Sequence, residues 1–271
     1  MERLAVNEMT TYRWTFEEDV EHYVKAGVRG IGVWRQKLSD FGEERGIELI
    51  ADSGLKVSSL LWAGGFTGSE GTTHRESIAD ALHAIRQAAA IGSGALVLYT
   101  GARAGHTHNH ARRLMRGALK AIAPLAEELG VSLAIEPMHP GCAADWTFLT
   151  DIDDTLALLD AVDSPAAKLC FDTYQLAQDP AVLDRIHELA PRTALVQLGD
   201  AKRPPDGEQD RCLLGEGVIP LGAVIAAFDA AGYDGFYELE LLGEEIEAAD
   251  YVDLLQRSKL AYADLLGVAG P

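Results

Sequence analysis

The chain has 271 residues, of which 48% are hydrophobic, and it carries a formal net charge of −19 at pH 7 with a pI of about 4.7. This length and apolar content are enough for one large domain with a substantial core. The acidic balance argues against a nucleic-acid partner and against binding to an anionic membrane, because both need a basic surface.

The cysteines and the N-terminal sequence indicate the cellular compartment. Three cysteines, Cys142, Cys170 and Cys212, are too few and too scattered for a disulfide framework or a thiolate zinc site. No cleavable signal sequence follows Met1, and no apolar run is long enough to span a bilayer. We therefore expect a soluble cytoplasmic protein.

Short apolar runs alternate with longer segments of helical periodicity along the whole chain. The expected strands are residues 3–9, 30–34, 56–65, 94–101, 131–137, 167–173, 193–200 and 235–242. Most of these runs are continuously apolar, which is typical of parallel strands that are covered on both faces.

The segments between the runs carry helix signals. Thr15 and Glu18 have the spacing of a capping box, and the helix that follows should end at Gly27. Thr150 and Asp153 repeat the capping-box spacing before another helix.

Three further helices are expected. Asp179 should cap a helix with Pro180 in its first turn. A long helix is expected over residues 110–129, ending at Gly130, and a last one over residues 246–266.

Eight βα units in a row favour a closed barrel. No linker, charge block or change of composition divides the chain, so residues 1–271 should form a single domain. Right-handed βα units build either an open sheet or a barrel, and eight units match a (β/α)8 TIM barrel of ~250 residues. A doubly wound sheet is the alternative, but no G-x-G-x-x-G fingerprint follows the first strand.

Polar residues gather at the carboxyl ends of the last four strands, where a barrel places its chemistry. Glu136 interrupts the apolar stretch "LAIEPMHPG", Asp172 ends the sixth run, Gln197 lies in the seventh and Glu240 in the eighth. Each acid taken alone reads as a helix cap or a surface residue. Carboxylates around one cavity would repel one another, and a divalent cation removes that repulsion. Oxygen ligands suit Mg²⁺ or Mn²⁺ better than Zn²⁺.

The eighth run offers two glutamates that face the same way, because residues two apart on a strand share a face. Glu240 lies nearer the carboxyl end and is the expected metal ligand. Glu238 should sit one layer deeper and support the ligands.

Several motifs now resemble a known family. The segments "LAIEPMHP", "FDTY", "VQLGD", "LGEGVIPL" and "GYDGFYELELL" are similar in order and spacing to the xylose-isomerase-like TIM barrel superfamily. The resemblance is to its sugar isomerase/epimerase branch, which includes ketose 3-epimerases, hydroxypyruvate isomerase and inosose-processing enzymes. It covers the chain from about the fourth strand to the end, and the whole chain more loosely.

This resemblance implies a metal held by Glu136, Asp172, Gln197 and Glu240, with Glu136 and Glu240 also acting as catalytic acid and base. The cofactor would be Mn²⁺ or Mg²⁺, with Co²⁺ as a further option. Many members have histidine where this chain has Gln197, although hydroxypyruvate isomerases are similar in having glutamine there. The chain also departs from the family at Gln175, where many members read "DTYH".

Five residues are expected to bind substrate: His139, Arg211, Trp62, His106 and Gln175. Arg211 matches an arginine that contacts substrate oxygens in similar proteins, and Gln175 stands where a histidine helps to hold substrate. Four of them have a plain structural alternative: a loop brace for His139, solvated loop residues for Arg211 and His106, and core packing for Trp62.

The expected reaction is isomerisation or epimerisation of a small carbohydrate or polyol through a metal-stabilised enediolate. A lyase or dehydratase acting on a keto-sugar or keto-inositol, including cleavage of a 3-keto-glycoside, is an alternative on the same scaffold. A non-catalytic sugar-binding or partner barrel is another. The endonuclease IV branch is disfavoured by the charge of −19 and by the scarcity of histidines at strand ends. Similar barrels often form homo-oligomers.

Overall fold

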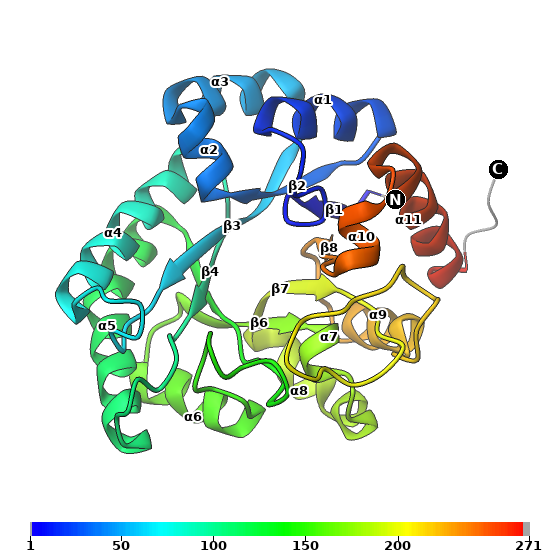
Figure 1. Ribbon diagram of the computed structural model, residues 1–271. Coiled ribbons are helices and arrows are strands. Elements are labelled where there is room, and N and C mark those ends of the chain that lie inside the picture. Colours follow the sequence, from blue (N-terminus) through cyan, green and yellow to red (C-terminus); the bar gives the residue numbers. More distant parts are fainter. Residues whose placement is uncertain (1, 268–271) are drawn as a thin grey trace.

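Eight parallel strands close into a barrel in the computed structural model, which describes residues 2–267 (Figure 1). Each strand pairs with the next, and β8 pairs with β1, so the sheet has no free edge. The (β/α)8 barrel is therefore confirmed and the open sheet excluded. The strands are β1 (Leu4–Asn7), β2 (Gly30–Trp34), β3 (Lys56–Gly64), β4 (Ala95–Tyr99), β5 (Ser132–Ile135), β6 (Ala167–Asp172), β7 (Thr193–Leu198) and β8 (Tyr237–Leu239).

Helices form a ring around the strands (Figure 1). They are α1 (Phe16–Ala26), α2 (Arg35–Phe41), α3 (Glu43–Ser53), α4 (His74–Ala90), α5 (His108–Leu129), α6 (Ile152–Val162), α7 (Thr173–Leu176), α8 (Ile186–Leu189), α9 (Leu221–Ala230), α10 (Glu244–Ala248) and α11 (Tyr251–Leu265), with 3₁₀ turns η1 (Pro180–Arg185) and η2 (Ala190–Arg192).

Most predicted helix ends are confirmed. The Thr15 hydroxyl accepts a hydrogen bond from the backbone of Glu18, whose carboxylate accepts one from the backbone of Thr15. Gly27 follows α1 in the left-handed region, with φ of 69°. Asp179 caps its segment as expected, and Pro180 lies in the first turn, although this segment begins as a 3₁₀ helix.

Three predicted helix boundaries are wrong. The cap of α6 is Asp151 rather than Thr150, because the Asp151 carboxylate accepts the backbone N–H of Asp154 at 2.9 Å. The long helix α5 begins two residues earlier than expected, at His108. The predicted last helix is two helices, because Asp250 caps a new one by accepting the backbone N–H groups that begin α11.

The strands are buried on both faces, as their continuous apolar sequences predict. A large cluster fills the space between barrel and helices. A smaller one lies inside the barrel and consists of Leu61, Ala95, Val97, Ala134, Cys170 and Leu195. Within residues 2–267, no helix has the length and apolar character that crossing a bilayer requires.

Candidate active site

The four residues predicted at the strand ends meet at one end of the barrel. Glu136 follows β5 directly, Asp172 ends β6, Gln197 lies in β7 and Glu240 follows β8. All four are buried, at 8%, 0%, 0% and 3% exposed respectively. Hydrogen bonds to the neighbouring strands fix the two glutamates, since the N–H of Glu136 donates to Leu98 and that of Glu240 to Leu198.

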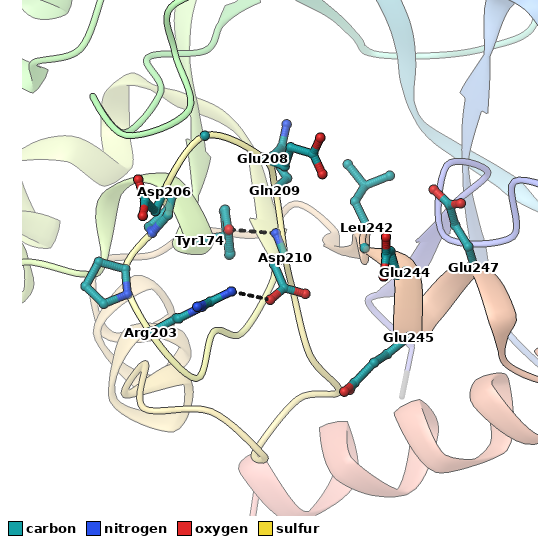
Figure 2. A pocket seen from close by; sticks show the side chains of 14 residues that line it. Tyr174, Arg203, Asp206, Glu208, Gln209, Asp210, Leu242, Glu244, Glu245 and Glu247 are labelled. Atoms are coloured by element: carbon teal, nitrogen blue, oxygen red, sulfur yellow. Dashed lines mark hydrogen bonds and ion pairs between the residues drawn. The ribbon is translucent and has the colours of Figure 1, made fainter.

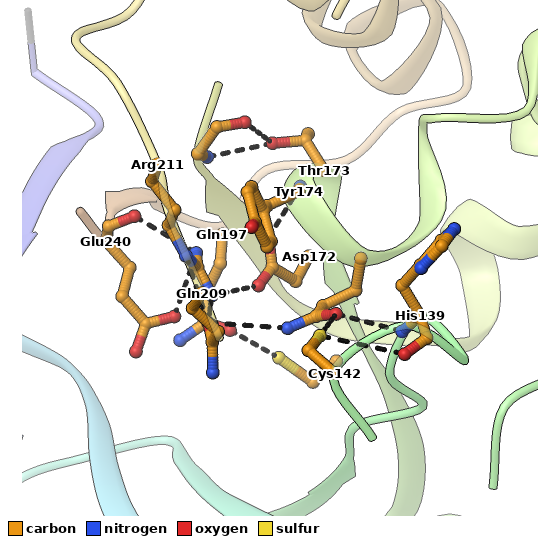
Figure 3. A network of polar contacts seen from close by, with 12 residues as sticks. His139, Cys142, Asp172, Thr173, Tyr174, Gln197, Gln209, Arg211 and Glu240 are labelled. Atoms are coloured by element: carbon orange, nitrogen blue, oxygen red, sulfur yellow. Dashed lines mark hydrogen bonds and ion pairs between the residues drawn. The ribbon is translucent and has the colours of Figure 1, made fainter. Parts of the chain in front are cut away.

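Arg211, in the loop after β7, lies between two of these acids (Figure 3). Its guanidinium contacts the Asp172 carboxylate at 2.8 Å and the Glu240 carboxylate at 3.3 Å. It also donates to the backbone carbonyl of Glu240 at 3.0 Å and to the Gln209 side chain at 2.6 Å, and it lies over the Tyr174 ring. The guanidinium therefore supplies a buried positive charge to the acidic cluster.

Burial changes the acidity of these carboxyl groups. Removal from water raises the pKa of Glu240 to about 8, although Arg211 opposes the change. Burial, followed by repulsion from Glu240 and Asp172, raises the pKa of Glu136 well above its usual value. Burial also raises the pKa of Asp172, against the opposing effect of Arg211. Two buried carboxyl groups whose pKa values are raised are suited to acid–base catalysis.

Gln197 points to a deeper polar network rather than to the carboxylates of the rim. Its amide N–H donates to Glu238 at 3.2 Å, and its amide oxygen accepts from the Cys170 thiol at 3.3 Å. Glu238 lies one layer below Glu240, where the sequence placed it. Glu238 accepts further hydrogen bonds from Asn7 (2.8 Å), Ser58 (2.6 Å) and Ser59 (2.6 Å).

The structure does not arrange the predicted ligands as a metal site. Within residues 2–267, no three His, Cys, Asp or Glu side chains are placed to hold an ion. Arg211 separates Asp172 from Glu240, and the amide oxygen of Gln197 is directed at Cys170. The metal therefore remains a proposal.

A cavity of about 200 Å³ opens beside these acids. Its walls combine aromatic and aliphatic side chains with a few converging polar groups, as small-molecule sites do. The ring centroids of Trp62 and Trp146 lie 5.9 Å apart, and those of Tyr99 and Trp146 lie 6.3 Å apart. The lining residues are Met9, Trp62, Tyr99, Glu136, Met138, Trp146, Gln209, Arg211, Glu240 and Leu242.

A larger outer cavity of about 730 Å³ adjoins the first and shares Gln209 and Leu242 with it (Figure 2). Arg203 lies here and pairs with Asp210 at 3.4 Å. Carboxylates dominate its lining, which disfavours an anionic substrate. They are Asp206, Glu208, Asp210, Glu244, Glu245 and Glu247.

The five predicted substrate-binding residues are placed differently from one another. Trp62 and Arg211 line the central cavity. Gln175 lies behind it, where its amide oxygen accepts the backbone N–H of His139 at 2.9 Å and so braces the loop. His139 and His106 are not among the residues that line this cavity, and their contact with substrate stays a prediction.

Local contacts explain where the two histidines lie. His139 accepts the backbone N–H of Gly141 at 3.0 Å and lines a separate cavity with Gln175. A ring nitrogen of His106 bonds the Thr67 carbonyl at 3.1 Å, and its ring lies beside His110.

Several cavity residues were not predicted from the sequence. Tyr99 ends β4, so the rule that chemistry lies at strand ends could have found it. Trp146 and Gln209 lie in long loops, and nothing local to their sequences places them at the cavity. The aliphatic wall of Met9, Met138 and Leu242 reads as ordinary core in the sequence.

The family model described as "Xylose isomerase-like TIM barrel" matches residues 20–260. This chain belongs to that family. The resemblance seen in the motifs is thereby confirmed. Among curated proteins, this xylose isomerase-like barrel is 30% identical over 147 residues to a mannonate dehydratase of Saccharophagus degradans. That match covers 53% of this chain and 32% of the dehydratase, so the chain spans about a third of the length of that relative.

Solved structures resemble this xylose isomerase-like barrel over nearly its whole length. Protein SMc04130 of Sinorhizobium meliloti 1021 superposes with a TM-score of 0.90 at 27% identity, covering 97% of this chain and 98% of that one. IolI protein with a bound zinc atom superposes with a TM-score of 0.83 at 19% sequence identity, and the match covers 98% of each chain. An L-ribulose 3-epimerase superposes with a TM-score of 0.81 at 20% sequence identity, and the match covers 99% of this chain and 96% of the epimerase. The last two likenesses establish a shared fold.

Proposed function

We propose that this protein is an isomerase or epimerase of a small, uncharged sugar or polyol, with Glu136 and Glu240 as its acid and base. The observation that carries the proposal is that both buried carboxyl groups, with raised pKa values, line one small cavity. An L-ribulose 3-epimerase shares the fold, and the acidic outer cavity favours a substrate without phosphate.

The chemistry follows from the two carboxyl groups. One carboxylate removes the proton from the carbon beside a carbonyl, and the electron pair moves into a C=C bond while the carbonyl oxygen becomes negative. The other carboxyl group, in its protonated form, delivers a proton to the opposite face and inverts that centre. Arg211 lines the same cavity and can stabilise the negative oxygen with its guanidinium N–H groups.

A divalent cation is included in the proposal on the chemistry of the donor atoms alone, because the described side chains are not arranged around one point and the Gln197 oxygen accepts from Cys170. Glu136, Asp172, Gln197 and Glu240 offer oxygen atoms, the donors that Mn²⁺, Mg²⁺ and Co²⁺ accept. Within residues 2–267 the Glu136 carboxylate accepts no hydrogen bond, and burial, followed by repulsion from Glu240 and Asp172, raises its pKa. When bound, the cation would polarise the substrate carbonyl as a Lewis acid.

Solvent deuterium uptake tests the proposed function. The protein is incubated in D₂O with Mn²⁺ and a panel of free ketoses, aldoses and keto-inositols, and NMR measures deuterium at each carbon. We expect exchange in at least one substrate, slowed by about 100-fold or more in Glu136→Gln and Glu240→Gln. Glu247→Gln, at the outer cavity, is the matched control and should exchange normally. Exchange at the parental rate in both glutamine variants of the central cavity would refute the assigned roles.

A dehydratase is the second candidate, favoured by the partial match to a mannonate dehydratase. Its first step is the same proton removal, after which a C=C bond forms as the hydroxyl on the neighbouring carbon takes a proton from the protonated carboxyl group and leaves as water. Mass spectrometry of the products separates the two, because a dehydratase yields a product lighter by one water and an epimerase yields one of unchanged mass.

A further inference from the structure

Gln209, in the loop between β7 and α9, holds its side-chain amide in one orientation (Figure 3). The amide oxygen accepts hydrogen bonds from Arg211 at 2.6 and 3.2 Å and from the Gln175 amide at 3.5 Å. A guanidinium can only donate, so the reverse orientation would set two donors against each other. The oxygen of Gln209 is therefore fixed toward Arg211, and its NH₂ group faces away from the guanidinium.

This NH₂ group has no protein partner. Within residues 2–267 it donates no hydrogen bond, because all the contacts of the Gln209 side chain are made by its oxygen. The side chain is half-buried and lines both the central and the outer cavity. A ligand that extends from one cavity into the other therefore meets two N–H donors whose direction is already set, which lowers the entropic cost of binding them.

Gln175 holds the Gln209 amide from behind. Gln175 is 2% exposed, and its own amide oxygen accepts the His139 N–H at 2.9 Å and the Cys142 thiol at 3.2 Å. These contacts leave the NH₂ group of Gln175 to donate to Gln209. Gln175 does not line the central cavity, so any effect it has on a ligand there passes through a neighbour.

The position of Gln209 indicates how long a ligand must be to reach it. The central cavity of about 200 Å³ is smaller than the ~300 Å³ at which small-molecule sites usually begin. One terminal nitrogen of Arg211 contacts Glu240 at 3.3 Å and the other contacts Gln209 at 2.6 Å, so the guanidinium lies between these two residues. A substrate whose reacting carbon lies beside Glu240 can reach Gln209 only with an oxygen several carbons further along its chain.

We propose that Gln209 is a specificity-determining residue whose amide N–H groups bind a distal oxygen of the substrate, and that Gln175 is its positioning residue. The substrate class is then a polyhydroxy ketone of pentose or hexose length, because a three-carbon ketone ends before it reaches Gln209. This inference rests on the proposed function and adds the length of the substrate to it.

Binding of free ketoses of increasing length to the full chain tests the recognition. The probes are dihydroxyacetone, L-erythrulose, D-xylulose and D-fructose, each titrated by NMR without added metal. We expect the parent to prefer the two longest ketoses over dihydroxyacetone. Gln209→Met keeps the length of the side chain and removes its donors. It should weaken the two longest by about fivefold, as one net hydrogen bond predicts, and leave dihydroxyacetone within about twofold.

The control carries the same substitution outside both cavities. Gln178 lines a separate cavity and donates to the backbone carbonyl of Tyr174 at 3.3 Å. Gln178→Met should keep the length preference of the parent.

The role of Gln175 is tested through the same length preference, since a general loss of structure would weaken all four ketoses alike. Gln175→Met should reduce the preference, because the Gln209 amide loses one of its fixed contacts. In a Gln209→Met background Gln175→Met should change the preference no further, because it acts through Gln209. An additive loss in the double variant would overturn the positioning role. If Gln175→Met does not fold, Gln209→Met and Gln178→Met decide the recognition.

Several results would overturn the recognition by Gln209. They are a parent that binds none of the ketoses or shows no length preference, a Gln209→Met variant that keeps the preference, and an equal loss in Gln178→Met. The readout needs no turnover. A failure of deuterium uptake with the length preference intact therefore rejects the proposed reaction and leaves the recognition standing, whereas uptake without a length preference rejects the recognition alone.

Discussion

The buried Glu240 carboxyl group makes the stability of the metal-free protein depend on pH in a defined direction. Its pKa is about 8 in the fold and 4.5 ordinarily, a difference of 3.5 units. Between those values the folded protein holds a proton that the unfolded chain has released, so the free energy of unfolding falls as pH rises through this window. At ~1.4 kcal/mol per pKa unit, the free energy of unfolding falls by at most about 5 kcal/mol across this window.

Replacing Glu240 with glutamine removes this titration and keeps the shape of the side chain. At pH 5 both proteins carry a neutral group there, and we expect similar stability. By pH 9 the variant should have gained about 2 to 5 kcal/mol relative to the parent, a range that allows for charge shared with Glu136. Urea unfolding in EDTA at each pH unit measures the difference. Glu247→Gln, an exposed counterpart, should track the parent. Parallel pH curves for Glu240→Gln and the parent would refute the reasoning.

Three further outcomes are expected. Lys37→Met should lower the free energy of unfolding, measured in urea, by about 3 to 5 kcal/mol. Lys37 pairs at 2.6 Å with the buried Asp19, and a buried oxygen of Glu8 has no hydrogen-bond partner. A decrease below ~1 kcal/mol contradicts this. Trp146→Ala should raise KM for the substrate with little change in Tm, because Trp146 walls the cavity yet is 44% exposed; an unchanged KM counts against the cavity. Mn²⁺ at 100 times its Kd should stabilise the parent by about 2.7 kcal/mol, and a Glu136→Gln variant that gains as much excludes Glu136 as a ligand.

The architecture was predictable because its signals are local. Continuous apolar runs, capping residues and glycine stops recur along the chain, and eight units leave few topologies open. The wrong cap of α6 shows where local signals fail. Thr150 and Asp151 can both cap a helix, and the backbone path into α6 determines which side chain reaches the free N–H groups.

Local sequence signals predict the site only where strands carry it, and Arg211 was predicted through the family resemblance alone. Glu136, Asp172 and Glu240 are placed by the barrel itself, and their position follows from strand ends. Arg211 is placed by long-range contacts, since its N–H donates to the carbonyl of Leu242 and that of the next residue to Asp200. The same limit applies to His106 and His139, whose loops are held by contacts that no spacing rule reveals.

The acidic outer cavity also bears on how quickly an ion could arrive. Its carboxylates lie beside the central cavity, and a field of one sign enriches dissolved counter-ions near a surface. At physiological ionic strength this enrichment reaches only ~8 Å, and it shrinks as salt is added. We expect divalent ions to load rapidly in dilute buffer and more slowly in concentrated salt.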